Sequence, residues 1–336
     1  MKTGKLNLIT DVEGVLIGNA HDESIKSGVT VFTSEKSFAA SVSVLGGAPG
    51  TRETELLDSD KLVQEVDALV LSGGSAYGLD APSGVMDCLR EESKGYQVKD
   101  INVPIVPGAI LFDLLNGGSK NWRENPYRDL AKEAYASKDK TFKIGTAGAG
   151  YGATTINLKG GLGSSSLLLD NGITVGALVA VNPGGSVVTN GSNSFWAKPF
   201  EIGNEFGDKK FILPDKININ YLQGGAFQFE DNTIKNTTIA IVATDLELSK
   251  VDLKRISIAA HDGISRAIVP SHTPFDGDLV FAASTAVKKM ETDSVTLSII
   301  GYAAAICLSR AIARAVYEAS PEKNDIYPTW KEVCGT

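Results

Sequence analysis

Residues 237–245 read Thr-Thr-Ile-Ala-Ile-Val-Ala-Thr-Asp, a segment that predicts a strand. The run at 237–244 is β-branched or apolar throughout, which is typical of a central strand buried on both faces of a sheet. The preceding residues 196–235 are polar and irregular, with two prolines and a Gly-Gly step, and predict a long surface excursion. The chain therefore changes character at the peptide bond between Asn236 and Thr237.

The segments on either side of this strand predict the fold class. Apolar residues recur at helical spacing over 253–268 and again over 297–316, so two helices with core-facing stripes are expected. Short β-like runs cover residues 6–44, a buried strand is expected at 66–71, and a helix follows at about 80–90. Strands early and helices late, without regular alternation, predict an α+β fold with helices layered on sheets.

The glycine-rich run at 148–153, Gly-Ala-Gly-Tyr-Gly-Ala, has the spacing of a dinucleotide-binding fingerprint. That fingerprint requires a helix after the glycines, whereas residues 154–158, Thr-Thr-Ile-Asn-Leu, predict a continuing strand. We therefore interpret the run as a turn and expect no organic cofactor.

Composition excludes several classes of partner. The net charge of −8 and the lack of a dense Lys/Arg block argue against nucleic acid and anionic membranes. Three widely spaced cysteines form no paired motif, which argues against a disulfide framework and a zinc site. The N-terminus lacks a signal-type apolar stretch, and the uncharged residues 295–309 are shorter than the roughly 20 residues of a membrane span. We expect a cytoplasmic, metal-free protein with a small-molecule or protein partner.

The junction of Asn236 and Thr237 is the sharpest chemical signal. An Asn-Thr pair before a strand is most often an ordinary turn, but this pair marks the switch from polar chain to core strand. A threonine exposed as a new N-terminus carries its own base, because an α-amino group titrates near about 7.7 to 8.0. We therefore predict self-cleavage before Thr237, whose hydroxyl becomes the nucleophile.

Other polar residues are candidates for the same site. Asp276 and Asp278 flank a turn-forming glycine, although a surface turn is the commoner fate of such a triplet. Lys159 is a cation amid glycine turns and apolar strands, where it could lower the pKa of an amine or stabilise an oxyanion. His272 stays open as an alternative general base, whereas His261 lies in a helical stripe and is interpreted as structural.

Six motifs lie in order along the chain: ITDVEGV at 9–15, GGAPGTRET at 46–54, SGGSAYGL at 72–79, KGG at 159–161, VATD at 242–245 and DGDLVFA at 276–282. Together they resemble the L-aminopeptidase/D-amidase-D-esterase (DmpA-type) peptidase family. That family includes β-peptidyl aminopeptidases and the nylon-oligomer (6-aminohexanoate-oligomer) endohydrolase. The resemblance runs from end to end and implies an amide hydrolase.

The resemblance also implies a fold and a processing event. The expected fold is a four-layer αββα sandwich of the N-terminal-nucleophile hydrolase type, in one domain spanning 1–336. Cleavage would divide it into 1–236 and 237–336, two fragments that remain partners. A homo-oligomer, a tetramer by resemblance, is expected as well.

The resemblance assigns roles residue by residue. Thr237 is the nucleophile, and its own α-amine accepts the proton. Lys159 and Asn182 line the site, with Asn182 and backbone N–H groups stabilising the oxyanion. Asp276 and Asp278 hold the hydrogen-bond network of the nucleophile. The substrate-binding residues by the same resemblance are Tyr77 and Phe112.

Substrate choice stays open at this point. The nylon-oligomer enzyme has a tyrosine where Phe112 stands here, whereas the Asn-Thr-Thr junction at 236–238 is similar to that enzyme. Short peptide amides and ω-amino-acid oligomers are therefore both candidate substrates. Two alternatives of other kinds are acetyl transfer, as in ornithine acetyltransferases, and an uncleaved binding protein.

Overall fold

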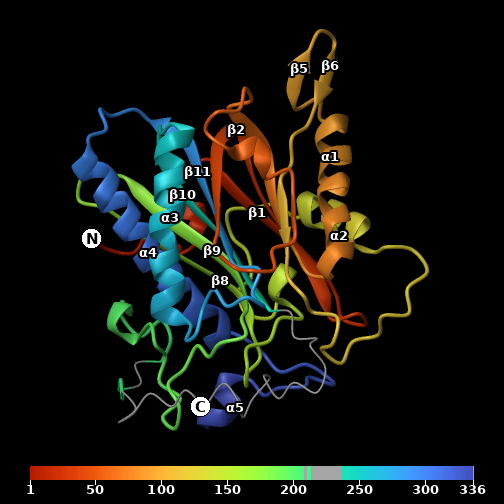
Figure 1. Cartoon of the computed structure of the whole chain (residues 1–336), viewed down its shortest axis with the longest axis vertical. Coiled ribbons are helices and arrows are strands. Elements are labelled where there is room, and N and C mark those ends of the chain that lie inside the picture. The colour runs from red at the N-terminus through yellow and green to blue at the C-terminus, as the bar shows by residue number, and fades with distance from the viewer. Residues whose placement is uncertain (208–209, 213–235, 336) are drawn as a thin grey trace.

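The computed structural model describes residues 1–207, 210–212 and 236–335 (Figure 1). Most of the surface excursion expected at 196–235 lies outside these residues. Its described part is not confined to the surface, because Ala197 and Phe206 are buried.

Helices and strands alternate irregularly along the chain, as the sequence predicts for an α+β fold. The strands are β1 (Val15–Asp22), β2 (Ser27–Val44), β3 (Thr51–Arg52), β4 (Glu65–Ser72), β5 (Tyr96–Val98), β6 (Ile101–Val103), β7 (Gly108–Ile110), β8 (Gly161–Leu168), β9 (Thr174–Asn182), β10 (Thr237–Leu246) and β11 (Leu279–Lys288). The helices are α1 (Ala81–Glu91), α2 (Tyr127–Ala136), α3 (Lys250–Ala267), α4 (Ser294–Tyr317) and α5 (Trp330–Cys334).

Among the described residues, nine strands form one sheet: eight follow the order β3-β7-β4-β2-β11-β10-β9-β8, and β1 pairs with β2 outside this path. The long strand β2 joins two halves of this sheet. Its residues 27–34 pair with β1, whereas residues 39–44 pair with β11. In the other half, β10 lies between β9, which is antiparallel to it, and β11, which is parallel to it.

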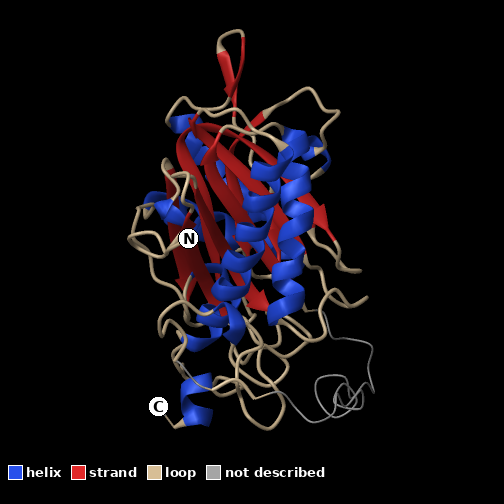
Figure 2. Cartoon of the chain, turned by 90° about the vertical axis from the view of Figure 1, so that its left-hand side faces the viewer, coloured by secondary structure: helices blue, strands red, loops and turns tan. Residues whose placement is uncertain are grey.

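Alternating side chains of these strands fill three separate cores. Ala240 and Val242 of β10 belong to a core shared with α3 and α4, while Ile241 between them belongs to a core between the two halves of the sheet. In β4, Val70 packs with α1 and α2, while Leu71 faces the central core. Three cores require four layers, so the αββα sandwich is confirmed. In Figure 2, the layer formed by α3 and α4 lies in front of the strands.

Most elements expected from the sequence are confirmed. The strand at 66–71 lies within β4, and the three expected helices are α1, α3 and α4. The strand expected at 154–158 is wrong. Thr155 N–H donates to the carbonyl of Leu158 at 2.8 Å, and the hydroxyl of Thr155 accepts from the N–H of Leu158, so the chain closes a local turn instead.

Helix α4 is longer than the uncharged stretch at 295–309 that the sequence marks. Within the described ranges it is the one helix long and apolar enough, by length and composition, to cross a membrane. In this fold, 67% of its most apolar window is buried. The apolar character is therefore accounted for by packing against β8, β9 and α3.

Candidate active site

The site is built where three strand ends meet. Because β9 runs antiparallel to β10 and β11 runs parallel to it, the end of β9 and the starts of β10 and β11 lie at one edge of the sheet. Asn182, the last residue of β9, pairs directly with Thr237, the first residue of β10. Asp276 and Asp278 immediately precede β11. The structure thus brings together four of the residues that the sequence nominates.

The hydroxyl of Thr237 lies against the carbonyl of the preceding residue. Its Oγ1 is 2.5 Å from the carbonyl oxygen of Asn236 and donates to it. The backbone N–H of Gly277 donates to the same carbonyl oxygen at 3.0 Å and to Thr237 Oγ1 at 3.2 Å. The predicted nucleophile and a backbone hydrogen-bond donor therefore both contact the carbonyl of the peptide bond predicted to break.

Gly277 is a functional position that sequence reasoning missed, because it reads as a simple turn residue. A Cβ atom there would lie 2.7 Å from the carbonyl oxygen of Ala48 and 2.8 Å from Thr237 Oγ1. Only glycine lets this backbone approach the Thr237 hydroxyl so closely. The sequence feature that could have identified Gly277 is its position between Asp276 and Asp278.

Asp278 fixes the start of β10 without touching the Thr237 hydroxyl. Its Oδ1 accepts from the backbone N–H of Thr238 at 2.7 Å. Its Oδ2 accepts from the backbone N–H of His272 at 3.0 Å and lies 2.9 Å from His272 Nδ1. The carboxylate therefore ties the nucleophile's strand to the loop before β11.

Asp276 fixes the loops on the other side of the nucleophile. Its Oδ1 accepts from the N–H of Gly184 at 3.1 Å, and its Oδ2 accepts from the N–H of Thr273 at 2.9 Å. Burial and then the neighbouring charge of Asp278 raise the pKa of Asp276 above its ordinary value. The two acids thus interact electrostatically, and each anchors backbone around Thr237.

Two histidines lie near Asp278: His272 contacts its carboxylate, and His261 packs against His272. Their rings are 4.9 Å apart, and His261 Nε2 lies 3.0 Å from the carbonyl oxygen of Ser43. Burial lowers the pKa of His261 to about 4, so this ring is neutral at pH 7. Among the described residues, neither ring forms a hydrogen bond to Thr237. Neither histidine is therefore placed to take a proton directly from the Thr237 hydroxyl.

Asn182 joins the nucleophile to two further segments. Its Oδ1 accepts from the N–H of Thr154 at 2.9 Å, and its Nδ2 donates to the carbonyl oxygen of Phe112 at 3.0 Å. A side-chain amide nitrogen carries two N–H groups, so one remains for the oxyanion role expected of Asn182. Phe112 is thereby placed beside the site through its backbone.

Tyr77 lies further out. The residue is 54% exposed, and its ring packs edge-on against Trp122, with ring centroids 5.8 Å apart. The glycine turn before it is held by Asp113, another residue that the sequence analysis missed. Asp113 Oδ1 accepts from the N–H of Gly74 at 2.7 Å and is fully buried. Asp113 directly follows Phe112, so two motif segments are joined at this point.

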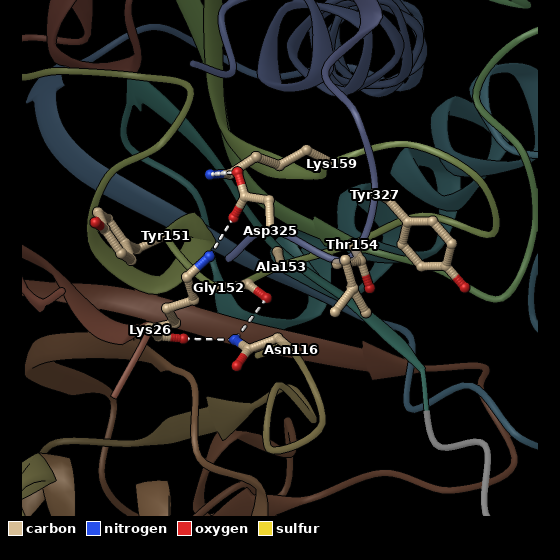
Figure 3. A pocket seen from close by; sticks show the side chains of 10 residues that line it. Lys26, Asn116, Tyr151, Gly152, Ala153, Thr154, Lys159, Asp325 and Tyr327 are labelled. Atoms are coloured by element: carbon tan, nitrogen blue, oxygen red, sulfur yellow. Dashed lines mark hydrogen bonds and ion pairs between the residues drawn. The ribbon is translucent and has the colours of Figure 1, made fainter. Parts of the chain in front are cut away.

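Lys159 lies in a small pocket beside Thr154 (Figure 3). Its Nζ forms an ion pair with Asp325 Oδ2 at 2.7 Å, and Lys26 pairs with the other oxygen of the same carboxylate. Within the described chain, no hydrogen bond or ion pair joins Lys159 to Thr237. Its connection to the nucleophile runs through Thr154, which forms an isolated β-bridge with Lys159 and donates to Asn182.

Over nearly its whole length, the chain is similar to known peptidases. The model of Peptidase family S58 matches residues 7–325. An uncharacterized aminopeptidase of Mycobacterium tuberculosis is 41% identical over 350 residues, covering 98% of each chain. A 6-aminohexanoate-oligomer endohydrolase of Paenarthrobacter ureafaciens is 27% identical over 291 residues, covering 84% of this chain and 76% of that protein.

Two solved structures share the fold. A β-aminopeptidase of a Burkholderia species has a TM-score of 0.71 at 18% identity, covering 96% of this chain and 90% of that one. An L-aminopeptidase D-Ala-esterase/amidase of Ochrobactrum anthropi, described as a variant of the Ntn hydrolase fold, has a TM-score of 0.69 at 21% identity with the same coverage. The architecture is therefore that of the N-terminal-nucleophile hydrolases. With the family match over nearly its whole length, the chain belongs to peptidase family S58 and is a hydrolase that acts on amide bonds.

Proposed function

We propose that this enzyme cleaves its own chain between Asn236 and Thr237 and then uses Thr237 as an N-terminal nucleophile against short peptide amides. The observation that carries the proposal is the contact of Thr237 Oγ1 with the Asn236 carbonyl, on which the Gly277 N–H also converges. The hydroxyl is thus already within hydrogen-bond distance of the carbonyl group that the proposal has it attack.

Self-cleavage proceeds by an acyl shift. Thr237 Oγ1 attacks the carbonyl carbon of Asn236, and the Gly277 N–H stabilises the negative charge that forms on the carbonyl oxygen. The C–N bond breaks, and the proton lost by the hydroxyl is balanced by the one that the leaving amine gains. Water then hydrolyses the resulting ester, which leaves a carboxylate on Asn236 and a free amine and hydroxyl on Thr237.

Turnover repeats this chemistry on a substrate. The α-amine of Thr237 takes the proton as its hydroxyl attacks the substrate carbonyl, and the free N–H of Asn182 stabilises the oxyanion. The amine product leaves with that proton, and water hydrolyses the acyl-enzyme ester. Asp276 and Asp278 hold the backbone that orients the nucleophile, and the buried Lys159 supports Asn182 through the turn that it shares with Thr154.

The substrate class follows from the relatives' names. The aminopeptidase relative is the more similar, which supports short peptides or amino-acid amides as the primary substrates. Linear 6-aminohexanoate oligomers are the second candidate, supported by the endohydrolase relative. The family match gives no support to the acetyltransferase alternative. The tetramer implied by resemblance stays a prediction that light scattering can test.

The test uses intact-mass analysis of purified protein beside two variants. Wild type should divide into fragments 1–236 and 237–336 and hydrolyse an amino-acid 4-nitroanilide. Thr237→Ala should remain whole and inactive, because it lacks the attacking oxygen. Thr238→Val is the matched control, since it alters the next buried threonine of β10 and should still be cut. A wild type that stays whole, or a cut at another bond, would refute the proposal.

A further inference from the structure

Two buried lysines share a single carboxylate near the site. The side chains of Lys26 and Lys159 are 6% and 4% exposed, and both pair with Asp325. Figure 3 shows the carboxylate between the two ammonium groups. Buried lysines are rare unless paired, so Asp325 is the group that makes this arrangement tolerable.

The three charges come from distant parts of the chain. Lys26 directly precedes β2, Lys159 lies just before β8, and Asp325 belongs to the loop between α4 and α5. The loop is fixed in place, because the N–H of Glu322 donates to Asp325 Oδ2 at 2.7 Å. In addition, the backbone N–H of Lys159 donates to the carbonyl of Pro328 at 2.8 Å. Cleavage before β10 would leave the lysines in one fragment and their counter-ion in the other.

Asp325 opposes two effects that disfavour the charge of Lys159. Burial, together with the nearby charge of Lys26, lowers the pKa of Lys159, whereas Asp325 acts to raise it. Hydrogen bonds from both lysines hold the pKa of Asp325 below its ordinary value, although burial acts in the opposite direction. Without this carboxylate, two buried cations would face each other.

The other ionisable groups around this cluster do not replace Asp325. Glu322 raises the pKa of Lys159 less than Asp325 does. The ring of Tyr151 has its centroid 5.9 Å from Lys159 Nζ, and Tyr327 also lines the pocket. On the side of Lys26, Lys120 adds a third ammonium group, which bonds to Asn116 Oδ1 at 3.2 Å.

The position of Lys159 affects the nucleophile through a short chain of contacts. Thr154 forms a β-bridge with Lys159, and the next residues close the turn because the N–H of Gly160 donates to the carbonyl of Ala153 at 2.8 Å. Thr154 in turn donates to Asn182 Oδ1 at 2.9 Å, and Asn182 pairs with Thr237. A displaced Lys159 would therefore disturb the residue expected to bind the oxyanion.

We propose that Asp325 is a positioning residue, which keeps Lys159 protonated and anchored so that the turn from Thr154 to Lys159 holds Asn182 against Thr237. The inference rests on the function proposed for Thr237. Beyond that function, it makes catalysis depend on the loop between α4 and α5, which holds Asp325 and takes no direct part in the reaction.

The test is Asp325→Asn, which preserves size and removes the charge. Lys159 then stays protonated only at lower pH, so the ratio of wild-type to variant kcat should widen from under about threefold near pH 6 to over about tenfold near pH 9. Dividing by the wild-type rate at each pH cancels the titration of the Thr237 amine. Adding Lys26→Met to this variant should restore part of the rate at high pH, because one buried ammonium no longer repels the other.

Asp245→Asn is the matched control. Asp245 is also buried, pairs with Lys288 at 2.9 Å and accepts from the N–H of Thr174 at 3.0 Å, but it lies near the far end of β10. Its substitution should lower thermal stability while the kcat ratio stays level across pH. The same level ratio in Asp325→Asn, or no gain from Lys26→Met, would overturn the inference and leave only a structural ion pair.

The outcomes separate this inference from the proposed function. A wild type that neither cuts itself nor hydrolyses the 4-nitroanilide refutes the role of Thr237, and the inference falls with it. An active wild type with an Asp325→Asn variant that behaves like the Asp245 control refutes the inference alone.

Discussion

Two polar regions lie close to the start of β10, and they are built in opposite ways. The strand-edge region of Thr237, Asp276 and Asp278 uses carboxylates that accept from backbone N–H groups, from residues near each other in sequence or in sheet register. The cluster of Lys26, Lys159 and Asp325 uses side-chain ion pairs between segments far apart in the chain. The first region holds the backbone around Thr237 in place, and the second balances buried charges. Substitutions in the two regions should therefore differ in how their effect on kcat depends on pH.

The largest loss of kcat is expected for substitutions of the two acids in the strand-edge region. Asp278→Asn and Asp276→Asn should each lower kcat by at least about tenfold, because each removes an anchor of the backbone around the nucleophile. The kcat ratio to wild type should be nearly independent of pH, unlike that of Asp325→Asn. Steady-state rates across the same pH series, with thermal unfolding of each variant, provide the measurement. Full activity in both variants would reduce the pair to an ordinary turn.

A smaller effect is expected for His272, whose hydrogen bonds to the strand-edge region, within the part of the chain that the structure describes, both go to Asp278. Replacement by Ala should change kcat by less than about fivefold, because the α-amine of Thr237 and not an imidazole receives the proton. The comparison enzyme is a mature wild type whose Thr237 amine has been acylated, which should be inactive. An inactive His272→Ala beside an active acylated enzyme would replace the amine mechanism by a histidine mechanism.

The smallest effect concerns His261 and appears in stability alone. Burial lowers its pKa to about 4 in the folded protein, whereas an unfolded histidine titrates near about 6.5. Between these values the unfolded chain binds a proton that the folded chain does not, so wild-type stability falls as pH falls through this window. When the pH falls from 7 to about 5, the free energy of unfolding of His261→Gln should decrease by about 1 to 2 kcal/mol less than that of the wild type. Urea unfolding at both pH values measures the difference, and equal losses would contradict it.

The strand-edge region could be predicted from sequence for a physical reason. Thr237 begins a strand whose unbroken apolar pattern places it in the centre of a sheet, and Asp276 and Asp278 immediately precede another. Gly277 escaped notice because its contribution is a backbone N–H, which leaves no side-chain signature. The turn at 154–158 was misread because β-branched residues suggested a strand, while local hydrogen bonds decided the structure.

The charge cluster could not be predicted in this way. No periodicity or spacing relates Lys26 to Asp325, which meet only because α4 returns the chain across β8 and β9. The sequence marks Lys159 as a cation in a nearly uncharged segment, but the identity of its counter-ion depends on tertiary structure. The four-layer fold itself came from the family resemblance, whereas the residue pattern reached only α+β.

The central place of β10 has a consequence for how the enzyme matures. The hydroxyl, the Asn236 carbonyl and the Gly277 N–H converge only after β9, β10 and β11 have assembled. On the proposed mechanism, a nascent or misfolded chain therefore lacks the arrangement needed for self-cleavage, and hydrolytic activity arises only in correctly folded molecules. A precursor held in urea should stay whole until dilution, and scission should then follow the recovery of the sheet.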